Sequence, residues 1–329
     1  MNMHRRFLGA LATTLLAALP LLANAQAWPT KPITLVIPFP PGNTADLVAR
    51  ALQEPLRRAF GQPVVVENRP GAGGNLALQA VARSDKDGHT LLVTTGSPLV
   101  INPALYKNPG FDAERDFVPV AIVGSIPMVL IARNDLPVQT LAELLAYLRA
   151  NESKVTFASV GQGTFTHLGM ELFSRSLGLN LTHVPYKGAS AAHTDLIGGR
   201  VDIMFDSLAS SNVLLKAGRV KPIAVTAPRR SPFLMDVPTV IEAGGTDLRT
   251  FEVTVWTGVF APAGTPPEAV RRINDEIGNQ LRSGEFRAQL AAQFIRADEP
   301  LTPSSFAVRV KADRERWTAL ARSNNVALQ

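Results

Sequence analysis

The apolar positions of this chain fall into short runs that alternate with segments of helical spacing. The first run, Ile33 to Ile37, is aliphatic and β-branched, which is typical of a strand buried on both faces. The Pro-Phe-Pro-Pro segment at 38–41 cannot continue a ladder of hydrogen bonds, so the strand must end there. Gly42 permits an unusual turn, and one of the polar residues among 43–46 can cap the helix that follows. The N-terminus of such a helix offers free N–H groups to an anion.

The same alternation of strand and helix continues along most of the chain. Strands are predicted at 64–66, 90–95, 155–159, 181–184, 201–205 and 223–226. Helices are predicted at 75–83, from 140 onward, and at 164–177, 191–197, 208–217, 269–281, 285–294 and 304–321. Elements that alternate at this spacing indicate parallel βαβ units, in which the ligand loops lie at the carboxyl ends of the strands.

Two stretches break the alternation and indicate two domains. The apolar runs 117–123 and 128–131 are too close for a helix between them, and 251–260 is one long strand-like run. We therefore predict an α/β fold of two doubly wound domains joined by crossing hinge strands. The predicted division is residues 26–125 with 251–329, and residues 126–250 inserted between them. The length of 329 residues agrees with this division, because such a chain exceeds one typical core.

The first 25 residues have the pattern of a secretory signal peptide. Arg5 and Arg6 precede an apolar run, and Ala23-Asn24-Ala25 is a small-residue cleavage site. A membrane anchor is disfavoured, because the run is short and contains Pro20. We therefore expect export to the periplasm, with cleavage near Ala25.

Composition narrows the class of exported protein. The chain has no cysteine, which removes disulfides, thiol catalysis and the acylated cysteine that tethers a bacterial lipoprotein. The net charge is +6, but Lys and Arg are scattered among Asp and Glu, which argues against a nucleic-acid partner. After residue 25 no window is long enough to span a bilayer. We expect a soluble, monomeric protein.

The glycine motifs do not point to a nucleotide cofactor. Gly161-x-Gly163, which precedes a helix capped by Thr164, is similar to a dinucleotide fingerprint. The third glycine position holds Thr166, however, and 180–184 has no acid for a ribose. The glycines at 71–74 are not followed by the lysine that a phosphate loop needs. We predict no cofactor.

Side chains for hydrolysis or metal binding are present without a recognisable pattern. The chain has no Gly-x-Ser-x-Gly elbow, although a triad can be drawn from Ser97, Ser159, His167, Asp46 and Asp206. His167 and Glu171 lie one helical turn apart, but a third metal ligand is not evident. We predict no catalytic or metal site, and an exported serine esterase or other hydrolase is the alternative function.

Arginine is missing from the loops that would face a ligand. None lies at 38–46, 71–75, 94–100, 159–166, 184–190 or 206–211, and within these ranges Lys187 is the only cation. A bound carboxylate would therefore rely on backbone N–H groups, hydroxyl groups and water. Asp206, which follows the strand at 201–205, either accepts a hydrogen bond from a ligand amine or hydroxyl or caps the next helix.

Several motifs together resemble those of the Bug proteins, the periplasmic solute receptors of tripartite tricarboxylate transporters. The match covers essentially the whole mature chain and is specific in combination. The motifs include Pro-Phe-Pro-Pro-Gly-x-x-x-Asp at 38–46, Asn-Arg-Pro-Gly-Ala-Gly-Gly at 68–74, Gly-x-Gly-Thr-x-x-His-Leu at 161–168, Val-Pro-Tyr-Lys-Gly at 184–188 and Trp-x-Gly-x-x-Ala-Pro at 256–262.

The resemblance implies a type II periplasmic-binding-protein fold. Its interdomain cleft would capture a small organic carboxylate and deliver it to the membrane permease subunits of the transporter. A binding protein that acts as ligand sensor for a two-component system is the nearest rival. Asn43 and Leu76 replace glycines that are common in the family, and such changes can narrow or reshape the pocket. Carried over by motif, the candidate ligand contacts are Phe39, Pro40, Pro41, Gly42, Asn43, Ala72, Gly73, Gly96, Ser97, Ser159, Gly161, Gly163, Thr164, His167, Tyr186, Lys187, Gly188 and Asp206.

Overall fold

The computed structural model of the protein describes residues 28–323, so the predicted signal peptide lies outside the described residues. The strands are β1 (Ile33–Ile37), β2 (Val64–Asn68), β3 (Thr90–Thr95), β4 (Phe117–Arg133), β5 (Thr156–Ser159), β6 (Thr182–Pro185), β7 (Ile203–Ser207), β8 (Val220–Val225), β9 (Thr254–Pro262) and β10 (Arg296–Ala297). In the sheet they follow the order β2-β1-β3-β9-β4-β7-β5-β6, and β8 and β10 each pair with β4 outside this order.

Helices cover both faces of this sheet. They are α2 (Thr44–Phe60), α3 (Asn75–Ala82), α4 (Ser97–Val100), α5 (Asn102–Leu105), α6 (Leu141–Asn151), α7 (Phe165–Ser176), α8 (Ala189–Ile197), α9 (Leu208–Lys216), α10 (Val240–Ala243), α11 (Pro267–Arg282), α12 (Gly284–Ala291) and α13 (Pro303–Ser323). Two short 3-10 turns, η1 (Ala72–Gly74) and η2 (Thr246–Leu248), complete the described elements. No helix within residues 28–323 is both long enough and apolar enough to cross a membrane.

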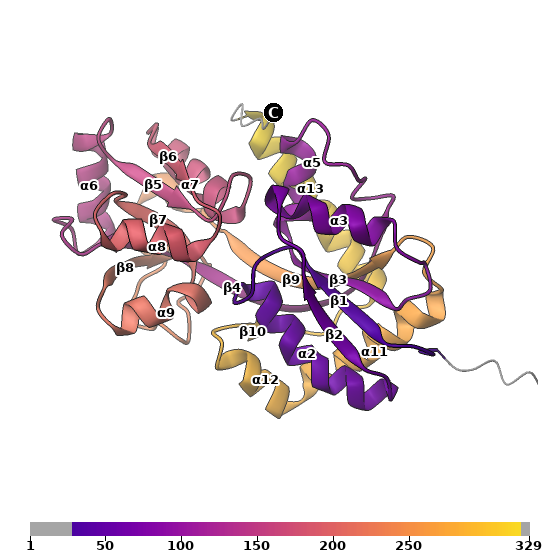
Figure 1. Ribbon diagram of the computed structural model, residues 1–329. Helices are drawn as coiled ribbons and strands as arrows, with labels where there is room; N and C mark the ends of the chain where they lie inside the picture. The colour runs from indigo at the N-terminus through magenta and orange to yellow at the C-terminus, as the bar shows by residue number, and fades with distance from the viewer. Residues whose placement is uncertain (1–27, 324–329) are drawn as a thin grey trace, which may run out of the picture.

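Figure 1 shows the elements gathered in two lobes. We call the part that holds β1, β2 and β3 with α2, α3 and α11 to α13 the main lobe. The part that holds β5 to β8 with α6 to α9 is the inserted lobe. β4 and β9 pass between the two lobes (Figure 1). Where each domain begins and ends along the chain stays a prediction.

Local sequence explains how the first helix of the main lobe starts and stops. The side chain of Asn43 accepts a hydrogen bond from the Ala45 N–H at 2.9 Å and so caps α2. Gly61 ends the helix in the left-handed region, at φ 65°, and its N–H donates to the Arg57 carbonyl. Of the polar residues predicted to cap this helix, Asn43 is therefore the one that does.

The structure corrects the prediction of two separate runs at 117–123 and 128–131. Both belong to β4, a single strand of 17 residues. Its first part pairs antiparallel with β9 as far as Pro127, and its second part pairs with β7 and β8. Gly124 and Ser125 also pair with β10. These neighbours keep the Gly-Ser-Ile-Pro segment extended, which sequence alone suggested would interrupt the strand.

Three chain segments meet where β4 passes from one lobe to the other. The Met128 N–H donates to the Thr226 hydroxyl at 3.0 Å, and the Thr226 N–H donates to the Met128 carbonyl at 2.9 Å. The Val253 N–H donates in turn to the Thr226 carbonyl at 3.2 Å. Hydrogen bonds therefore connect β4 at this crossing to the residue that follows β8, and that residue to the one that precedes β9.

Candidate functional site

Three turns of the main lobe meet at the carboxyl ends of β1, β2 and β3. In the parallel register Ile37 pairs with Asn68, so β1 and β2 end at one edge of the sheet. The turns also touch one another, because a Cβ atom built on Gly74 would lie 3.1 Å from both Pro38 and Pro98. The first three predicted loops therefore form one surface.

The first turn is held by a buried carboxylate. Asp46 is 2% exposed, and it accepts hydrogen bonds from the Gly42 N–H at 2.9 Å and from Arg50 Nε and Asn68 Nδ2 at 3.0 Å. Asn68 also donates to the Phe39 carbonyl at 3.0 Å. Burial alone would raise the pKa of Asp46, but these hydrogen bonds outweigh it and lower that pKa. The Gly42 N–H is thus occupied within the turn, while Pro40 and Pro41 are exposed.

The second turn presents unpaired backbone donors. Residues 71–74 all have positive φ, with Ala72 at 48° and Gly73 at 63°. Within residues 28–323 neither the Ala72 N–H nor the Gly73 N–H donates a hydrogen bond. The Asn102 side chain holds this turn from behind, donating to the Gly73 carbonyl at 3.1 Å and to Asn75 Oδ1 at 2.6 Å. Successive left-handed residues with free N–H groups form the concave nest that binds anions in many proteins.

Buried polar side chains without partners surround these donors. Thr44 is 5% exposed and Ser97 is 4% exposed, yet neither hydroxyl makes a hydrogen bond with another described residue. Asn75 is 2% exposed, and its Nδ2 likewise has no acceptor in the described part of the chain. Because none of these three atoms is bonded to another described residue, all three are available to a bound molecule or to water.

The turn between β5 and α7 is organised by its own side chains. The Gly163 N–H donates to His167 Nδ1 at 3.0 Å, and the Val160 N–H donates to the Thr166 hydroxyl at 3.0 Å. The prediction that the Thr164 side chain caps this helix is wrong. Thr164 occupies the capping position, but its hydroxyl donates to the Gly161 carbonyl at 2.6 Å and bonds the Thr166 hydroxyl. The first N–H groups of α7 therefore have no side-chain cap.

Two stacked histidines support this turn from the interior. The rings of His167 and His183 lie 3.9 Å apart and 10° from parallel. His183 Nε2 lies 2.7 Å from the Ser159 hydroxyl, and Ser159 is fully buried. Burial, together with the neighbouring His183, lowers the pKa of His167 to about 3, and burial lowers the pKa of His183 to about 4. Both rings are therefore neutral supports of the turn at physiological pH.

The stacked pair predicts a loss of stability in acid. Above pH 6.5 both histidines are neutral in the folded and the unfolded chain. As the pH falls from 6.5 towards 4, the two histidines bind protons in the unfolded chain but stay neutral in the folded chain, so the free energy of unfolding falls. We expect a loss of about 2 kcal/mol for each histidine by about pH 5. Urea unfolding at several pH values measures it.

A matched variant separates this effect from the carboxylates that also titrate in acid. His183→Gln removes one of the two titrating rings. We expect the part of the fall in unfolding free energy that the histidines cause to be about half as large in this variant. Equal pH dependence in the variant and the parent would contradict the assignment.

The remaining predicted contacts lie at two further turns of the inserted lobe. Ser159 and Tyr186 are linked, because the Tyr186 N–H donates to the Ser159 carbonyl at 3.0 Å. The Tyr186 hydroxyl donates to Asp195 at 2.8 Å, and burial together with that carboxylate raises the pKa of Tyr186 to about 12. Lys187 is exposed, and Gly188, at φ 133°, begins α8 without a side-chain cap.

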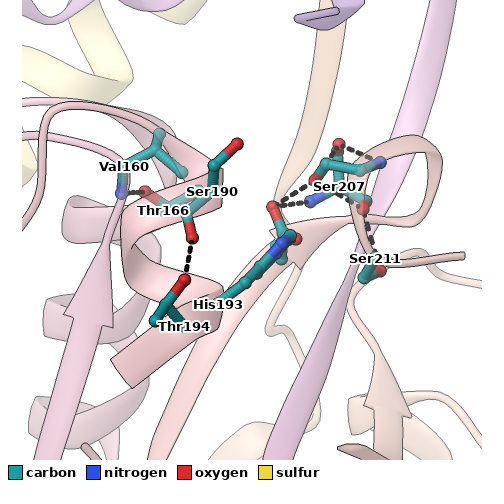
Figure 2. A network of polar contacts seen from close by, with 9 residues as sticks. Val160, Thr166, Ser190, His193, Thr194, Ser207 and Ser211 are labelled. Atoms are coloured by element: carbon teal, nitrogen blue, oxygen red, sulfur yellow. Dashed lines mark hydrogen bonds and ion pairs between the residues drawn. The ribbon is translucent and has the colours of Figure 1, made fainter. Parts of the chain in front are cut away.

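Asp206 closes the row of turns at the end of β7. Its carboxylate contacts His193 at 2.6 Å and accepts from the Ser207 N–H at 2.8 Å and the Ser210 hydroxyl at 2.5 Å (Figure 2). Ser207 caps α9, since its hydroxyl accepts from the Ser210 N–H at 3.2 Å. The alternative that Asp206 caps this helix is therefore wrong, because β7 extends two residues beyond the predicted end at 205 and Ser207 takes the capping position.

The two lobes touch beside the third turn. A Cβ atom built on Gly96 would lie 2.7 Å from the Trp256 ring and 3.2 Å from the Phe165 ring. Phe165 begins α7, and its ring packs edge-on against Trp317 of α13 with centroids 5.1 Å apart. The Gly96–Ser97 turn of the main lobe and the start of α7 in the inserted lobe are therefore neighbours.

Sequence reasoning missed most of the side chains that hold these turns. Asn68 and Asn102 stand in recognisable motifs, but their partners lie 22 to 29 residues away and cannot be read from spacing. His183 and His193 carried no signal beyond packing. Within the described residues no group of three acidic or histidine side chains could hold a metal ion, and His167 Nε2 lies 3.9 Å from Glu171.

Comparisons with known proteins agree with this architecture. The family model described as tripartite tricarboxylate transporter family receptor matches residues 48–320. Protein BugT of Bordetella pertussis is 33% identical over 334 residues, which cover 100% of this chain and 100% of BugT.

Two solved structures are similar over nearly their whole length. R. palustris Rpa4515 with adipate has a TM-score of 0.86 and 35% identity, covering 91% of this chain and 99% of its own. The periplasmic binding protein BugD has a TM-score of 0.82 and 35% identity, covering 92% of this chain and 100% of its own. The predicted type II periplasmic-binding-protein fold is thereby confirmed.

Proposed function

Because this chain belongs to the tripartite tricarboxylate transporter family receptors, which include the Bug proteins, we propose that it captures a small organic carboxylate between its two lobes. Members of this family are periplasmic solute-binding receptors. The R. palustris relative is described with adipate, a carboxylate, and that description supports the ligand class.

The observation that carries the proposal is the nest of free donors at Ala72 and Gly73. Two adjacent N–H groups without acceptors belong to the second turn, and the unpartnered hydroxyls of Thr44 and Ser97 belong to the two turns that adjoin it. Hydrogen bonds from such groups hold a carboxylate without an arginine. The uncapped starts of α7 and α8 supply donors from the inserted lobe.

We assign the ligand contacts turn by turn. In the main lobe they are Phe39, Pro40, Pro41, Gly42 and Asn43, then Ala72 and Gly73, then Gly96 and Ser97. In the inserted lobe they are Gly161, Gly163 and Thr164, then Tyr186, Lys187 and Gly188. Ser159, His167 and Asp206, which the motifs also suggested as contacts, instead support these turns from behind. The Ser159 hydroxyl, His167 Nδ1 and the Asp206 carboxylate are already bonded within the protein.

Capture would close the lobes about the crossing of β4 and β9. A ligand that contacts both lobes binds the closed form better than the open form, so it shifts the equilibrium towards closure. The closed form of a monomer would then deliver the ligand to the membrane permease subunits of a tripartite tricarboxylate-type transporter. A sensor role for a two-component system uses the same closure with a different partner.

The hydrolase alternative has less support from the geometry. Ser159 bonds His183, but the serine is fully buried and no described carboxylate bonds that histidine. Ser97 has no histidine partner among the described residues. A serine nucleophile needs both an accessible hydroxyl and a base oriented by a third group.

Thermal unfolding with a panel of mono- and dicarboxylates tests the function. A ligand at about 100 times its Kd adds about 2.7 kcal/mol to the free energy of unfolding, which raises the Tm by about 5 °C or more. Gly73→Ala should weaken this binding at least about tenfold. Its Cβ would lie 2.7 Å from the Tyr106 hydroxyl, and the φ of 63° disfavours any side chain.

Gly178→Ala is the matched control, because Gly178 also has positive φ, at 70°, but has open space around it. We expect it to lose about 1 kcal/mol of stability and to bind as the parent does. If no carboxylate stabilises the parent, and it instead hydrolyses a chromogenic ester through Ser97 or Ser159, the hydrolase replaces the receptor.

A further inference from the structure

The carboxylate of Asp206 has no capacity left for a ligand. The side chain is 2% exposed, and one oxygen accepts from both the Ser207 N–H and the Ser210 hydroxyl. The other oxygen contacts His193 Nε2 at 2.6 Å. A buried carboxylate is costly unless it is paired, and here every contact comes from a donor at the inserted-lobe turns.

The same contact leaves one nitrogen of His193 without a partner. Because Nε2 carries the proton that it donates to Asp206, Nδ1 is the free position of the ring. Within residues 28–323 Nδ1 makes no hydrogen bond, and the side chain remains 12% exposed. Figure 2 shows the ring reaching from α8 across to the carboxylate that precedes Ser207.

The position of His193 places it at the ligand edge of the inserted lobe. It lies about one helical turn beyond the uncapped start of α8 at Gly188. Asp206 lies at the carboxyl end of β7, which pairs with β5 beside the turn at Ser159. The other acid of α8, Asp195, is already bound by Tyr186 and Arg200 at 2.8 Å each. Lys187 is exposed, so His193 is the partly buried basic group of this helix.

Resting on the proposed function, we propose that His193 contacts the far end of the ligand and selects carboxylates that carry a second polar group there. Asp206 is the positioning residue, which turns Nε2 inward and presents Nδ1. When neutral, the ring accepts at Nδ1 from a ligand hydroxyl, and when protonated it donates from Nδ1 to a second carboxylate. A histidinium paired with a carboxylate has no net charge, so the buried acid does not repel the anion.

Isothermal titration of the full mature chain with acids of equal length tests this selection. Succinate is compared with butyrate, and adipate with hexanoate. We expect at least one dicarboxylate to bind about tenfold or more tightly than its monocarboxylate counterpart, as one hydrogen bond to a charged group allows. His193→Gln keeps an amide donor for Asp206 and removes Nδ1, so the preference should fall below about threefold.

Two further variants and a control define the result. Asp206→Asn should lose the preference as well, because the ring is no longer oriented. His193→Asn places its amide near the position of Nδ1, so it should keep more of the preference than His193→Gln. Thr194→Ala, an exposed neighbour on α8 whose hydroxyl bonds the Ser190 carbonyl, should behave as the parent.

The outcomes separate this inference from the proposed function. If the parent binds no carboxylate, the proposed function fails and the inference fails with it. If the parent binds carboxylates but His193→Gln keeps the parental preference, or keeps more than His193→Asn, only the role of His193 is overturned.

Discussion

Asp46→Ala is expected to weaken carboxylate binding at least about 100-fold and to destabilise the main lobe by about 2–4 kcal/mol. The substitution removes a buried acceptor and leaves the donors of Gly42 and Asn68 without it, and each such loss costs about 1–3 kcal/mol. The first turn then keeps only the bond from Asn68 to the Phe39 carbonyl as its side-chain contact with β2. We expect a Kd raised at least about 100-fold, measured by isothermal titration, and a lower urea midpoint.

Asp275→Ala is the control for Asp46→Ala. Asp275 forms an ion pair with Arg271 four residues away at 3.1 Å, as Asp46 does with Arg50, but its side chain is 57% exposed. Exposed pairs of this kind contribute less than about 1 kcal/mol, so we expect binding to be unchanged. Parental affinity in Asp46→Ala would show that the first turn is not part of the site.

Phe165→Ala should lower the free energy of unfolding by about 3–5 kcal/mol and also weaken ligand binding. Phe165 is 3% exposed and fills the space between Trp317 and the Gly96 turn, so alanine leaves a cavity where the lobes touch. The start of α7 loses its anchor on the main lobe. We expect about tenfold weaker binding and faster hydrogen exchange in the first turn of α7.

Phe173→Ala provides the comparison on the same helix. Phe173 is fully buried and packs edge-on against Phe205, with centroids 5.6 Å apart, inside the inserted lobe. Phe173→Ala should also lower the free energy of unfolding by about 3–5 kcal/mol, but without a specific effect on ligand affinity. Equal binding defects in the two variants would mean that the contact between the lobes has no separate role.

The first strand shows why some elements could be predicted from sequence. The predicted strand 33–37 is the observed β1, and 90–95 is the observed β3. Prolines end the first strand, and the Gly96–Ser97 turn ends the other. β10 shows the opposite case, because its two residues are a strand only by pairing with Gly124 and Ser125. No local pattern marks so short an element.

Some features of the candidate site could likewise be predicted from the sequence, and others could not. Motif and composition indicated turns that lack arginine, and the structure brings the main-lobe turns together at one edge. They did not indicate that the Gly42 N–H is already taken by Asp46 while the Ala72 N–H is free. Whether a donor is free depends on every acceptor that folding brings near it.

By itself the sequence determined the class of fold, the family and the places where strands turn into helices, because proline, glycine and apolar spacing act on the neighbouring backbone. Only the tertiary structure decided that β4 runs unbroken between the lobes, that Asp206 holds His193, and that Phe165 meets Trp317. The physical reason is that these contacts join residues 13 to more than 150 positions apart along the chain, and their geometry exists only once the chain has folded.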